Sequence, residues 1–317
     1  MSARLSVILT AFNGMPFLPS AVESIRSQSF SDYTLIIVDD GSTDGTEEYL
    51  RSLRDERLKL IRQTNSGLGA ARNTALSHCT SEYVAVMDQD DFSLPDRLSS
   101  QVAYLDAHPD VVAVGTQVEF MVGGSVQKAP GIPTTHEDIE RRLLGGRAGV
   151  CHPSLMYRVA QAVAVGGYPV GVMGEDITFC LKMAEQGRFA NLSETHFRYR
   201  LHAGQASTSR NRDLILANHY AAYCALCRRN NFPQPALDAF VRNASWIKRL
   251  RWLMEAEQLT QYRTARVRLA EGHRLEGSVR LAFAGLCQPL SAMRRVASIA
   301  IDHTRDRSKS DLRTAAQ

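Results

Sequence analysis

The first part of the chain alternates short aliphatic or β-branched runs with amphipathic stretches, and this alternation limits the possible folds more than any other feature. Four runs have the composition of buried strands: Leu5–Thr10, Thr34–Asp39, Leu58–Arg62 and Tyr83–Asp88. Between the first two, Pro16–Gln28 carries apolar residues at helical spacing. Strands that alternate with helices form βαβ units around a mostly parallel sheet. The sequence therefore predicts an α/β fold.

The pattern changes after about residue 95. A helix is predicted at Pro95–His108, and Val111–Val122 holds one or two strands before a Gly123-Gly124 turn. From about Asp213 the spacing is helical and no clear strand remains. We therefore expect three parts, at residues 1–95, 96–210 and 211–317.

Cysteine content and hydropathy bear on where such a chain works. Its six cysteines are scattered without the spacing of a disulfide framework, which favours a reducing compartment. No apolar run approaches the roughly 20 residues of a membrane-spanning helix. We expect a cytoplasmic protein without a membrane span.

Basic residues are concentrated in the C-terminal extension. Residues 246–317 contain 14 Lys or Arg against 7 Asp or Glu, whereas the first 245 contain 23 against 26. Cations beside an apolar stripe can bind anionic lipid, which would allow peripheral contact with the inner face of the membrane. The alternative is a helical layer packed on the catalytic domain. The residues concerned are Arg263, Arg266, Arg268, Arg274 and Arg280, with Arg294 and Arg295 and the runs Leu281–Leu290 and Val296–Ile301.

Two acidic groups come directly after predicted strands. Asp39 and Asp40 end one strand, and Asp88, Asp90 and Asp91 follow another. The carboxyl ends of parallel strands share one edge, where α/β sheets bind ligands, so we expect these groups to converge on one pocket. Clustered carboxylates repel each other unless a cation or hydrogen-bond donors compensate, and Mg²⁺ or Mn²⁺ with substrate phosphates would do so. The alternative is two solvated turns.

Other phosphate-binding classes lack their motifs. Gly67-Leu-Gly-Ala-Ala-Arg72 is missing the third glycine of a dinucleotide fingerprint, and there is no G-x-x-x-x-G-K-[ST] sequence. Neither NAD nor P-loop chemistry is indicated, and we expect no nucleic-acid partner.

Five motifs together resemble the family 2 glycosyltransferases over about residues 4–205. The resemblance implies a GT-A-type single domain, with a Rossmann-like nucleotide-sugar-binding half at 1–95 and an acceptor-binding half at 96–210. A helical basic extension follows at 211–317. The motifs are Leu5-Ser-Val-Ile-Leu-Thr-Ala-Phe-Asn13, Val38-Asp-Asp-Gly-Ser-Thr-Asp44, Ala71-Arg-Asn73, Asp88-Gln-Asp-Asp91 with Leu94-Pro-Asp-Arg-Leu98, and Gly174-Glu-Asp176.

The resemblance also assigns donor-binding residues. Thr10, Ala11 and Asn13, at the end of the first strand, match positions that line the nucleotide base and ribose. Asp40 matches a position with the same role, and Arg72 matches one near the nucleotide.

The metal assignment follows the family's D-x-D element. Asp90 matches the metal ligand, and Asp88 matches the residue that contacts the ribose or a metal-bound water, with Mn²⁺ or Mg²⁺ as the cofactor. Gln89 is interpreted as a filler position and Asp91 as a support for the loop. His202 resembles a tail histidine that some members use near the metal, although a lone histidine is more often structural.

The acidic pair Glu175-Asp176 matches the pair that supplies the family's catalytic base. It precedes a helix-like run at Ile177–Gln186, and Asp176 is the candidate base with Glu175 as its rival. The plain alternative is favourable charge at a helix N-terminus. His152 precedes a strand that borders the acceptor pocket in the family, and its role stays open.

The resemblance thus implies an inverting, metal-assisted transferase of polysaccharide biosynthesis. Its donor would be a nucleoside diphosphate hexose, with UDP as the commonest nucleotide, and its acceptor a hydroxyl of a glycan or lipid-linked saccharide. One alternative is a sugar-phosphate nucleotidylyltransferase, which would want a cationic loop where Ala11–Phe17 has no Lys or Arg. Another is a non-catalytic glycan-binding or scaffold protein, against which the presence of Asp90 and Asp176 argues.

Overall fold

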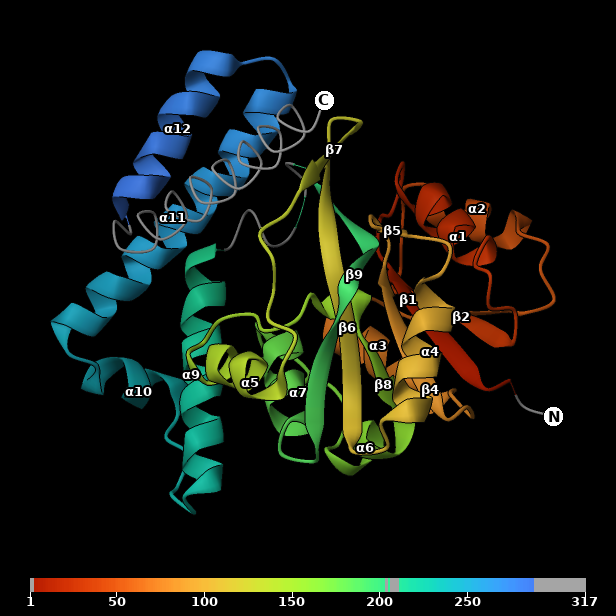
Figure 1. Ribbon diagram of the computed structural model, residues 1–317, viewed down its shortest axis with the longest axis horizontal. Coiled ribbons are helices and arrows are strands. Elements are labelled where there is room, and N and C mark those ends of the chain that lie inside the picture. Colours follow the sequence, from red (N-terminus) through yellow and green to blue (C-terminus); the bar gives the residue numbers. More distant parts are fainter. Residues whose placement is uncertain (1–2, 203–204, 206–210, 288–317) are drawn as a thin grey trace, which may run out of the picture. The chain divides into compact units, whose positions relative to one another are not determined.

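The computed structural model describes residues 3–202, 205 and 211–287 (Figure 1). The chain forms two compact units. The larger comprises Met1–Leu201 and Leu216–Arg242, and the smaller comprises His202–Ile215 and Asn243–Gln317.

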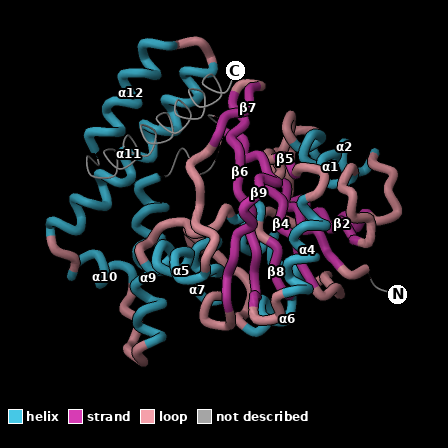
Figure 2. The backbone as a smooth tube through the Cα atoms, in the orientation of Figure 1, coloured by secondary structure: helices cyan, strands magenta, loops and turns pink. Residues whose placement is uncertain are grey.

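The larger unit is built on one nine-stranded sheet (Figure 2). The strand order is β3-β2-β1-β4-β8-β6-β9-β5, and β7 pairs with β6. β3, β2, β1 and β4 are parallel, β8 runs antiparallel to both its neighbours, and β6 is parallel to β9. The strands are β1 (Leu5–Ala11), β2 (Tyr33–Asp39), β3 (Leu58–Arg62), β4 (Tyr83–Asp88), β5 (Phe92–Ser93), β6 (Val111–Val122), β7 (Ser125–Lys128), β8 (Met156–Arg158) and β9 (Arg188–Leu201).

Helices cover both faces of this sheet, so the strands in its middle are buried on both sides. In β2, Leu35 and Ile37 belong to the core cluster that includes residues of α1, α2 and α4, whereas Ile36 and Val38 belong to the cluster that includes residues of α3 and α7. This period of two explains the near-continuous apolar runs. The helices are α1 (Leu18–Arg26), α2 (Thr46–Ser52), α3 (Leu68–Ser77), α4 (Arg97–Ala107), α5 (His136–Leu144), α6 (Val159–Ala164) and α7 (Glu175–Met183), with the 3-10 turn η1 (His152–Ser154).

The four strands predicted in the first 95 residues are confirmed to within one residue at each end. Val111–Val122 is a single strand, and its continuation Ser125–Lys128 pairs back onto it across the two glycines. No strand follows β9 in the described residues, which confirms the helical extension. Its helices are α9 (Asn211–Arg229), α10 (Leu237–Asn243), α11 (Trp246–Ala270) and α12 (Arg274–Cys287).

In the smaller unit, α11 and α12 pack together through small residues. A Cβ added at Gly277 would lie 2.5 Å from Cγ of Leu269, so a side chain there would force the helices apart. Ala265 and Ala284 are buried in the same unit. Among the described helices, none is long and apolar enough to cross a membrane. The basic pair 294–295 and the run Val296–Ile301 lie outside the described residues.

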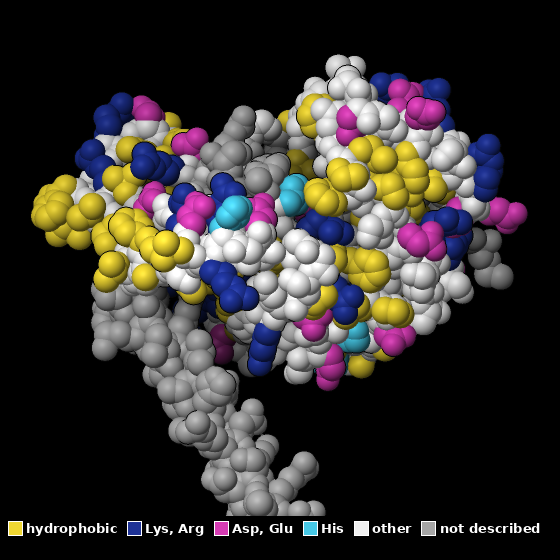
Figure 3. Space-filling model, turned by 90° about the horizontal axis from the view of Figure 1, so that it is seen from above, with side chains coloured by type: hydrophobic (Ala, Val, Ile, Leu, Met, Phe, Trp, Pro, Cys, Tyr) yellow, Lys and Arg dark blue, Asp and Glu magenta, His cyan; other side chains and the backbone are white. Residues whose placement is uncertain are grey.

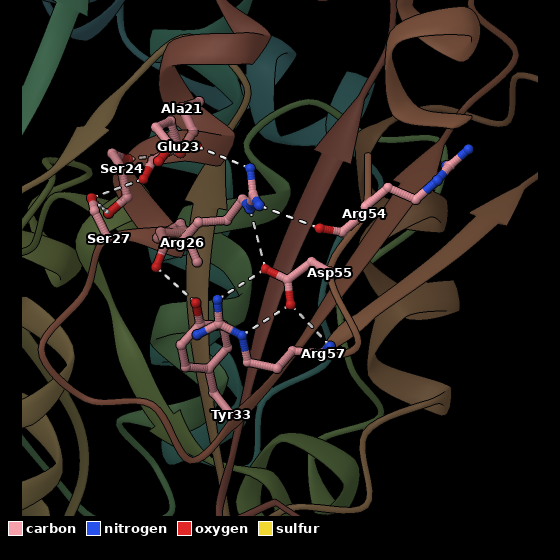
Figure 4. Close-up of polar contacts among 10 residues, drawn as sticks. Ala21, Glu23, Ser24, Arg26, Ser27, Tyr33, Arg54, Asp55 and Arg57 are labelled. Atoms are coloured by element: carbon pink, nitrogen blue, oxygen red, sulfur yellow. Dashed lines mark hydrogen bonds and ion pairs between the residues drawn. The ribbon is translucent and has the colours of Figure 1, made fainter. Parts of the chain in front are cut away.

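A charged cluster connects the last residue of α1, Arg26, to the loop before β3 (Figure 4). Asp55 accepts hydrogen bonds from Nε of Arg26 at 3.2 Å and from Nη2 of Arg57 at 2.9 Å. Beside it, the Tyr33 hydroxyl donates to the carbonyl of Ile25. The hydrogen bonds from Arg57 are the main reason that the pKa of Asp55 is held well below its usual value.

Candidate active site

The two acidic groups do lie on one edge of the sheet, because their strands flank β1. Ala11 is in register with Asp39, and Thr10 is in register with Asp88. Thr10 and Ala11 are both buried, and the carbonyl of Ala11 accepts a hydrogen bond from the Asp40 amide at 2.8 Å. The expectation of a shared edge is confirmed.

The expectation of one pocket for all five carboxylates stays a prediction, and protein groups already bind several of them. Asp40 accepts hydrogen bonds from Nε2 of Gln63 and from the amides of Ser66 and Gly67, at 2.7 to 2.9 Å. It therefore fastens the loop that leads into α3, and these donors balance its charge in place of a cation.

Asp39 faces a separate cavity. Its Oδ1 accepts from the amide of Ser42, and its Oδ2 lies 3.5 Å from Nε of Arg62. Arg62 also forms an ion pair with Glu47. Asp39, Glu47 and Arg62 line a cavity of about 240 Å³ together with Arg51 and two leucines. Asp88 and Asp90 are not among the residues that line this cavity.

Gln89 connects the loop after β4 to the loop after β1. Its Oε1 accepts a hydrogen bond from the Phe12 amide at 2.8 Å, and its Nε2 donates to the Phe12 carbonyl at 3.1 Å. A two-bond pairing with the backbone is not the behaviour of a filler, so that interpretation is wrong. Only an amide side chain of this length supplies both the donor and the acceptor.

Asn13 joins the same loop to the glycine-rich turn after β2. It adopts a positive φ of 48°, a conformation that asparagine tolerates better than most residues. Its side-chain Oδ1 accepts a hydrogen bond from the Thr43 backbone amide at 2.8 Å, and its backbone amide donates one to Oγ of Ser42. The structure thus places Asn13 in the loop architecture at the sheet edge, and its predicted contact with nucleotide stays a prediction.

Arg72, on α3, is the centre of the site. It is 3% exposed, and it donates to Oδ1 of Asp88 at 2.9 Å and to Oε1 of Glu175 at 3.0 Å. Its guanidinium also lies 5.4 Å from the centre of the Tyr168 ring. Burial lowers the pKa of Arg72, but the charges of Asp88 and Glu175 raise it by more. One buried cation therefore connects the end of β4 with the start of α7.

The carboxylates around Arg72 carry more negative charge than one guanidinium balances. The pKa of Asp88 is raised by burial and by the charges of Asp90 and Asp176, against the opposing effect of Arg72. The pKa of Glu175 is raised by burial and by the charge of Asp176. The charges of these carboxylates therefore influence one another, and the four residues concerned are Asp88, Asp90, Glu175 and Asp176.

Asp176 differs from its neighbour in what it binds. The pair begins α7, as predicted, after Gly174, whose φ of 67° is in the left-handed region. Glu175 forms the ion pair with Arg72, whereas Oδ1 of Asp176 accepts from the amide of Ile177 at 2.7 Å. Of the two acids, Glu175 is the one held by the buried cation.

Asp91, the acid that follows the D-x-D element, bonds to the backbone of β9. Asp91 is 1% exposed, and its Oδ1 accepts from the Arg200 amide at 2.8 Å. Nε of Arg200 in turn donates to the carbonyl of Asp90. The loop is thereby fastened to β9, which agrees with the interpretation of Asp91 as its support. Burial and the charges of Asp90 and Asp88 raise the pKa of Asp91 well above its usual value.

The predicted metal ligands come from different parts of the chain. Asp88 and Asp90 follow the same strand, but His202 belongs to the smaller unit, where its amide donates to Oε1 of Gln205. In the described part of the chain, no group of three or more His, Cys, Asp or Glu side chains is arranged to hold a metal ion. Metal binding by His202 stays a prediction.

Residues on the other side of Arg72 hold α3 against the loop before α7. Asn73 donates to the Tyr168 carbonyl and accepts from the Tyr168 amide, at 2.7 and 2.8 Å. A Cβ at Gly69 would lie 2.3 Å from the Pro169 carbonyl oxygen, so only glycine permits this approach. His152 is buried with Nε2 3.1 Å from the Tyr168 hydroxyl, and burial lowers its pKa well below the usual value. Burial therefore favours the neutral form of the His152 imidazole.

Comparisons with known proteins identify the family. A family model described as "Glycosyl transferase family 2" matches residues 6–163. EpsE of Bacillus subtilis (strain 168), named as a glycosyltransferase, is 34% identical over 277 residues, which cover 83% of this chain and 94% of EpsE. The chain belongs to glycosyltransferase family 2. It is therefore a transferase, and the family resolves the choice against a nucleotidylyltransferase.

A second relative and two solved structures extend the comparison. WfaP of Escherichia coli, named as a UDP-Glc:alpha-D-GlcNAc-diphosphoundecaprenol beta-1,3-glucosyltransferase, is 26% identical, covering 67% of this chain and 82% of WfaP. TarS 1–349 of S. aureus in complex with UDP-GlcNAc superimposes with a TM-score of 0.58 at 20% identity, covering 88% of this chain and 89% of TarS. PcManGT of Pyrobaculum calidifontis in complex with GDP-Man and Mn²⁺ superimposes with a TM-score of 0.54 at 21% identity, covering 95% of this chain and 80% of PcManGT. These structures confirm the GT-A fold.

Two parts of the site were not predicted from the sequence. The pairing of Gln89 with Phe12 depends on a loop geometry that no periodicity encodes. The ion pair of Arg72 with Glu175 joins residues 103 positions apart, and the only sequence signal was that both belong to family motifs.

Proposed function

We propose that this glycosyltransferase moves a hexose from a UDP-sugar to a hydroxyl of a glycan or lipid-linked saccharide, with inversion and with Asp176 as the general base. The observation that supports this most is the position of Arg72. It contacts Asp88 from the donor half and Glu175 from the acceptor half in a single buried ion-pair network. Donor-binding and proton-accepting groups are thereby held at a fixed separation.

The donor site would lie at the carboxyl edge of β1, β2 and β4. Thr10, Ala11 and Asn13 follow β1 at this edge, and Asp40 follows β2. Uracil as the base is supported by the UDP-Glc in the name of WfaP and by the UDP-GlcNAc bound to TarS, although PcManGT binds GDP-Man. Which sugar is transferred is a matter for donor screening.

Asp88 and Asp90 fit a hard divalent cation. Their oxygens are the ligands that Mn²⁺ and Mg²⁺ prefer, and one or two carboxylates suffice when substrate phosphates complete the shell. The charge of Asp90 contributes to the raised pKa of Asp88, and a bound cation would relieve this repulsion. When bound, such an ion would stabilise the negative charge of the departing diphosphate. His202 is a further candidate ligand.

Proton removal would fall to Asp176. A sugar hydroxyl is too weakly acidic to attack at neutral pH, so a carboxylate must accept its proton as the new bond forms. Glu175 is already bonded to Arg72, which leaves Asp176 as the acid of the pair better placed to accept a proton. Arg72 then acts as a positioning residue that fixes the start of α7.

The acceptor and location follow the relatives. WfaP acts on a diphosphoundecaprenol-linked sugar by its name, which supports a lipid-linked acceptor and a role in polysaccharide biosynthesis for this chain. We place the enzyme in the cytoplasm, at the inner face of the membrane where such an acceptor would be available.

Acceptor-dependent UDP release tests the activity. The purified chain is incubated with UDP-Glc, UDP-GlcNAc or UDP-Gal, with and without GlcNAc-diphosphoundecaprenol or a short-chain analogue. Release that requires acceptor and Mn²⁺ or Mg²⁺ supports the proposal. If UDP stabilises the protein thermally but no donor is turned over with any acceptor in this set, a binding protein on the same fold becomes the better account.

The nucleotide preference is tested separately. Thermal unfolding is followed with UDP, GDP or dTDP, each with and without Mn²⁺, because a ligand stabilises the native state by an amount that grows with its concentration over its dissociation constant. We expect the largest increase with UDP and Mn²⁺ together. A larger increase in unfolding temperature with GDP would overturn the choice of UDP as the nucleotide. The proposed transfer reaction would not be affected.

A further inference from the structure

The first turns of α11 carry a patch of large apolar side chains that are exposed. Trp246 is 72% exposed, Ile247 53%, Leu250 47% and Leu253 50%. Ser245 caps the helix, its hydroxyl accepting from the Lys248 amide, so the helix begins where the patch begins. Figure 3 shows hydrophobic side chains gathered at the left edge of the view, with basic side chains close by.

Basic residues border this patch. At about 100° per residue, Trp246, Leu250 and Leu253 fall within an arc of about 60° on the helix, with Ile247 next to it. Arg249 and Arg251 fall on either side of this apolar arc and Lys248 lies behind it, and all three are exposed. The segment Trp246–Met254 contains no Asp or Glu. We call Trp246, Ile247, Leu250 and Leu253, with their three basic neighbours, the α11 face.

A second exposed apolar stripe has a carboxylate among its charged neighbours. Leu275 and Val279 of α12 are 82% and 61% exposed. Arg274, which is exposed, precedes them, and Arg280 forms an ion pair with Glu276 at 2.9 Å. Arg268 likewise pairs with Glu271. Arg268 and Arg280, which the sequence suggested as lipid contacts, are thus balanced within their own helical pair.

We propose that the α11 face docks on the surface of an anionic lipid bilayer. Apolar side chains with cations on both borders are the arrangement of helices that lie in a membrane interface, and tryptophan is favoured at that depth. Charge complementarity selects lipid as the occupant, because anionic headgroups would balance Arg251, which borders the apolar side chains and with which no described carboxylate pairs. The α12 stripe is equally apolar but has Glu276 beside its arginines, and it provides an internal comparison.

This inference goes beyond the proposed activity and does not depend on it. The α11 face contains no residue of the proposed active site, so lipid binding can fail while transfer to a soluble acceptor persists. If both hold, docking would bring the enzyme to the surface that presents a lipid-linked acceptor.

Tryptophan fluorescence reports directly on this helix, because the two tryptophans of the chain, Trp246 and Trp252, are both in α11. The Trp252→Phe variant leaves Trp246 as the sole emitter. With vesicles of phosphatidylglycerol and phosphatidylcholine we expect a blue shift of its emission and quenching by lipids brominated on the acyl chain. No shift with anionic vesicles at low salt would overturn the proposal.

Co-sedimentation then compares two matched double variants of the full chain. Trp246→Ser with Leu250→Ser should weaken binding to anionic vesicles by at least about tenfold, since each side chain buried in lipid contributes more than a tenfold factor. Leu275→Ser with Val279→Ser removes a similar exposed apolar area from α12 and should bind like wild type. Circular dichroism and stabilisation by UDP check that all variants are folded.

Charge and oligomerisation complete the test. Arg251→Glu, and 0.5 M NaCl for wild type, should each reduce binding by about tenfold or more, because a reversed charge repels anionic lipid and a screened cation attracts it weakly. Equal binding to pure phosphatidylcholine vesicles would overturn the charge argument. Equal loss in the α12 variant would overturn the assignment to α11. If Trp246→Ser with Leu250→Ser instead converts a dimer to a monomer and wild type ignores vesicles, the occupant is a second copy of the chain.

Discussion

Replacing Arg72 with glutamine tests whether the buried ion-pair network holds the two halves of the site together. The glutamine amide can keep one hydrogen bond but carries no charge. Asp88 and Glu175 would then face each other, with Asp90 and Asp176 nearby, and no cation between them. We expect both a less stable fold and a weaker donor site.

The cost follows from burial. Removing one partner of a buried ion pair costs about 3–5 kcal/mol. The side chains of Asp88 and Glu175 are 27% and 16% exposed, so water recovers part of that loss. We therefore expect Arg72→Gln to lower the free energy of unfolding by about 2–4 kcal/mol, which for a domain of this size lowers Tm by about 5–10 °C.

The pH dependence has a defined sign. Burial raises the folded-state pKa of Asp88 and of Glu175, so these carboxyls are protonated in the folded protein before they are in the unfolded chain. Without Arg72 their pKa values rise further, and protonation then relieves the repulsion. The difference in the free energy of unfolding between Arg72→Gln and wild type should be largest at neutral pH. It should shrink as the pH falls through these raised pKa values.

The assay is urea denaturation from pH 4 to 8, with Arg188→Gln as the control. Arg188 pairs with Glu137 at 2.9 Å, but these side chains are 48% and 59% exposed, so its loss should cost less than about 1 kcal/mol. Equal destabilisation by the two variants at neutral pH, or a deficit for Arg72→Gln that grows towards acid pH, would refute the reasoning.

Three further predictions concern single residues. Asp90→Ala should weaken UDP binding in calorimetry at saturating Mn²⁺ but not in its absence, and equal affinity with metal would remove Asp90 as a ligand. Gln89→Leu removes two hydrogen bonds to the Phe12 backbone and should weaken UDP binding by up to about tenfold; unchanged affinity would mean that this pairing is unimportant for donor binding. Asp55→Asn should destabilise the fold by about 1–3 kcal/mol above pH 4, where wild-type Asp55 is ionised, and this difference should fade as the pH drops below the unfolded carboxyl pKa of about 3.9. A difference independent of pH would show that the charge of Asp55 contributes nothing.

Strands and their common edge were predictable because they depend on local patterns. In β2 and β4 the apolar run ends at an aspartate, and both the run and its end can be read from the amino-acid sequence. The edge position of Asp39 and Asp88 then follows from parallel pairing alone. Burial on both faces explains why the first four strands were predicted to within a residue.

Partners of polar side chains were not predictable in the same way. Asp40 and Asp88 follow similar strands, yet Asp40 bonds to three donors of a loop and Asp88 bonds to Arg72. That difference depends on where residues 63–72 return to the sheet edge, which is a tertiary property. Hydrogen-bond donors compensate the charge of Asp40, and the sequence alone does not show whether donors or a cation do so at a given carboxylate.

Turnover of Asp176→Asn and Glu175→Gln, measured side by side, tests the central claim most directly. Acceptor-dependent UDP release is followed for both variants and wild type, and UDP affinity is measured separately for each. The account predicts that Asp176→Asn keeps UDP affinity within about threefold while transfer falls on the order of 10²–10⁴, because the amide cannot accept the proton of the acceptor hydroxyl. Glu175→Gln should lose stability through Arg72 and retain more transfer than Asp176→Asn. If Asp176→Asn keeps more than about a tenth of wild-type turnover, or if Glu175→Gln alone abolishes transfer with UDP binding intact, Asp176 is not the base.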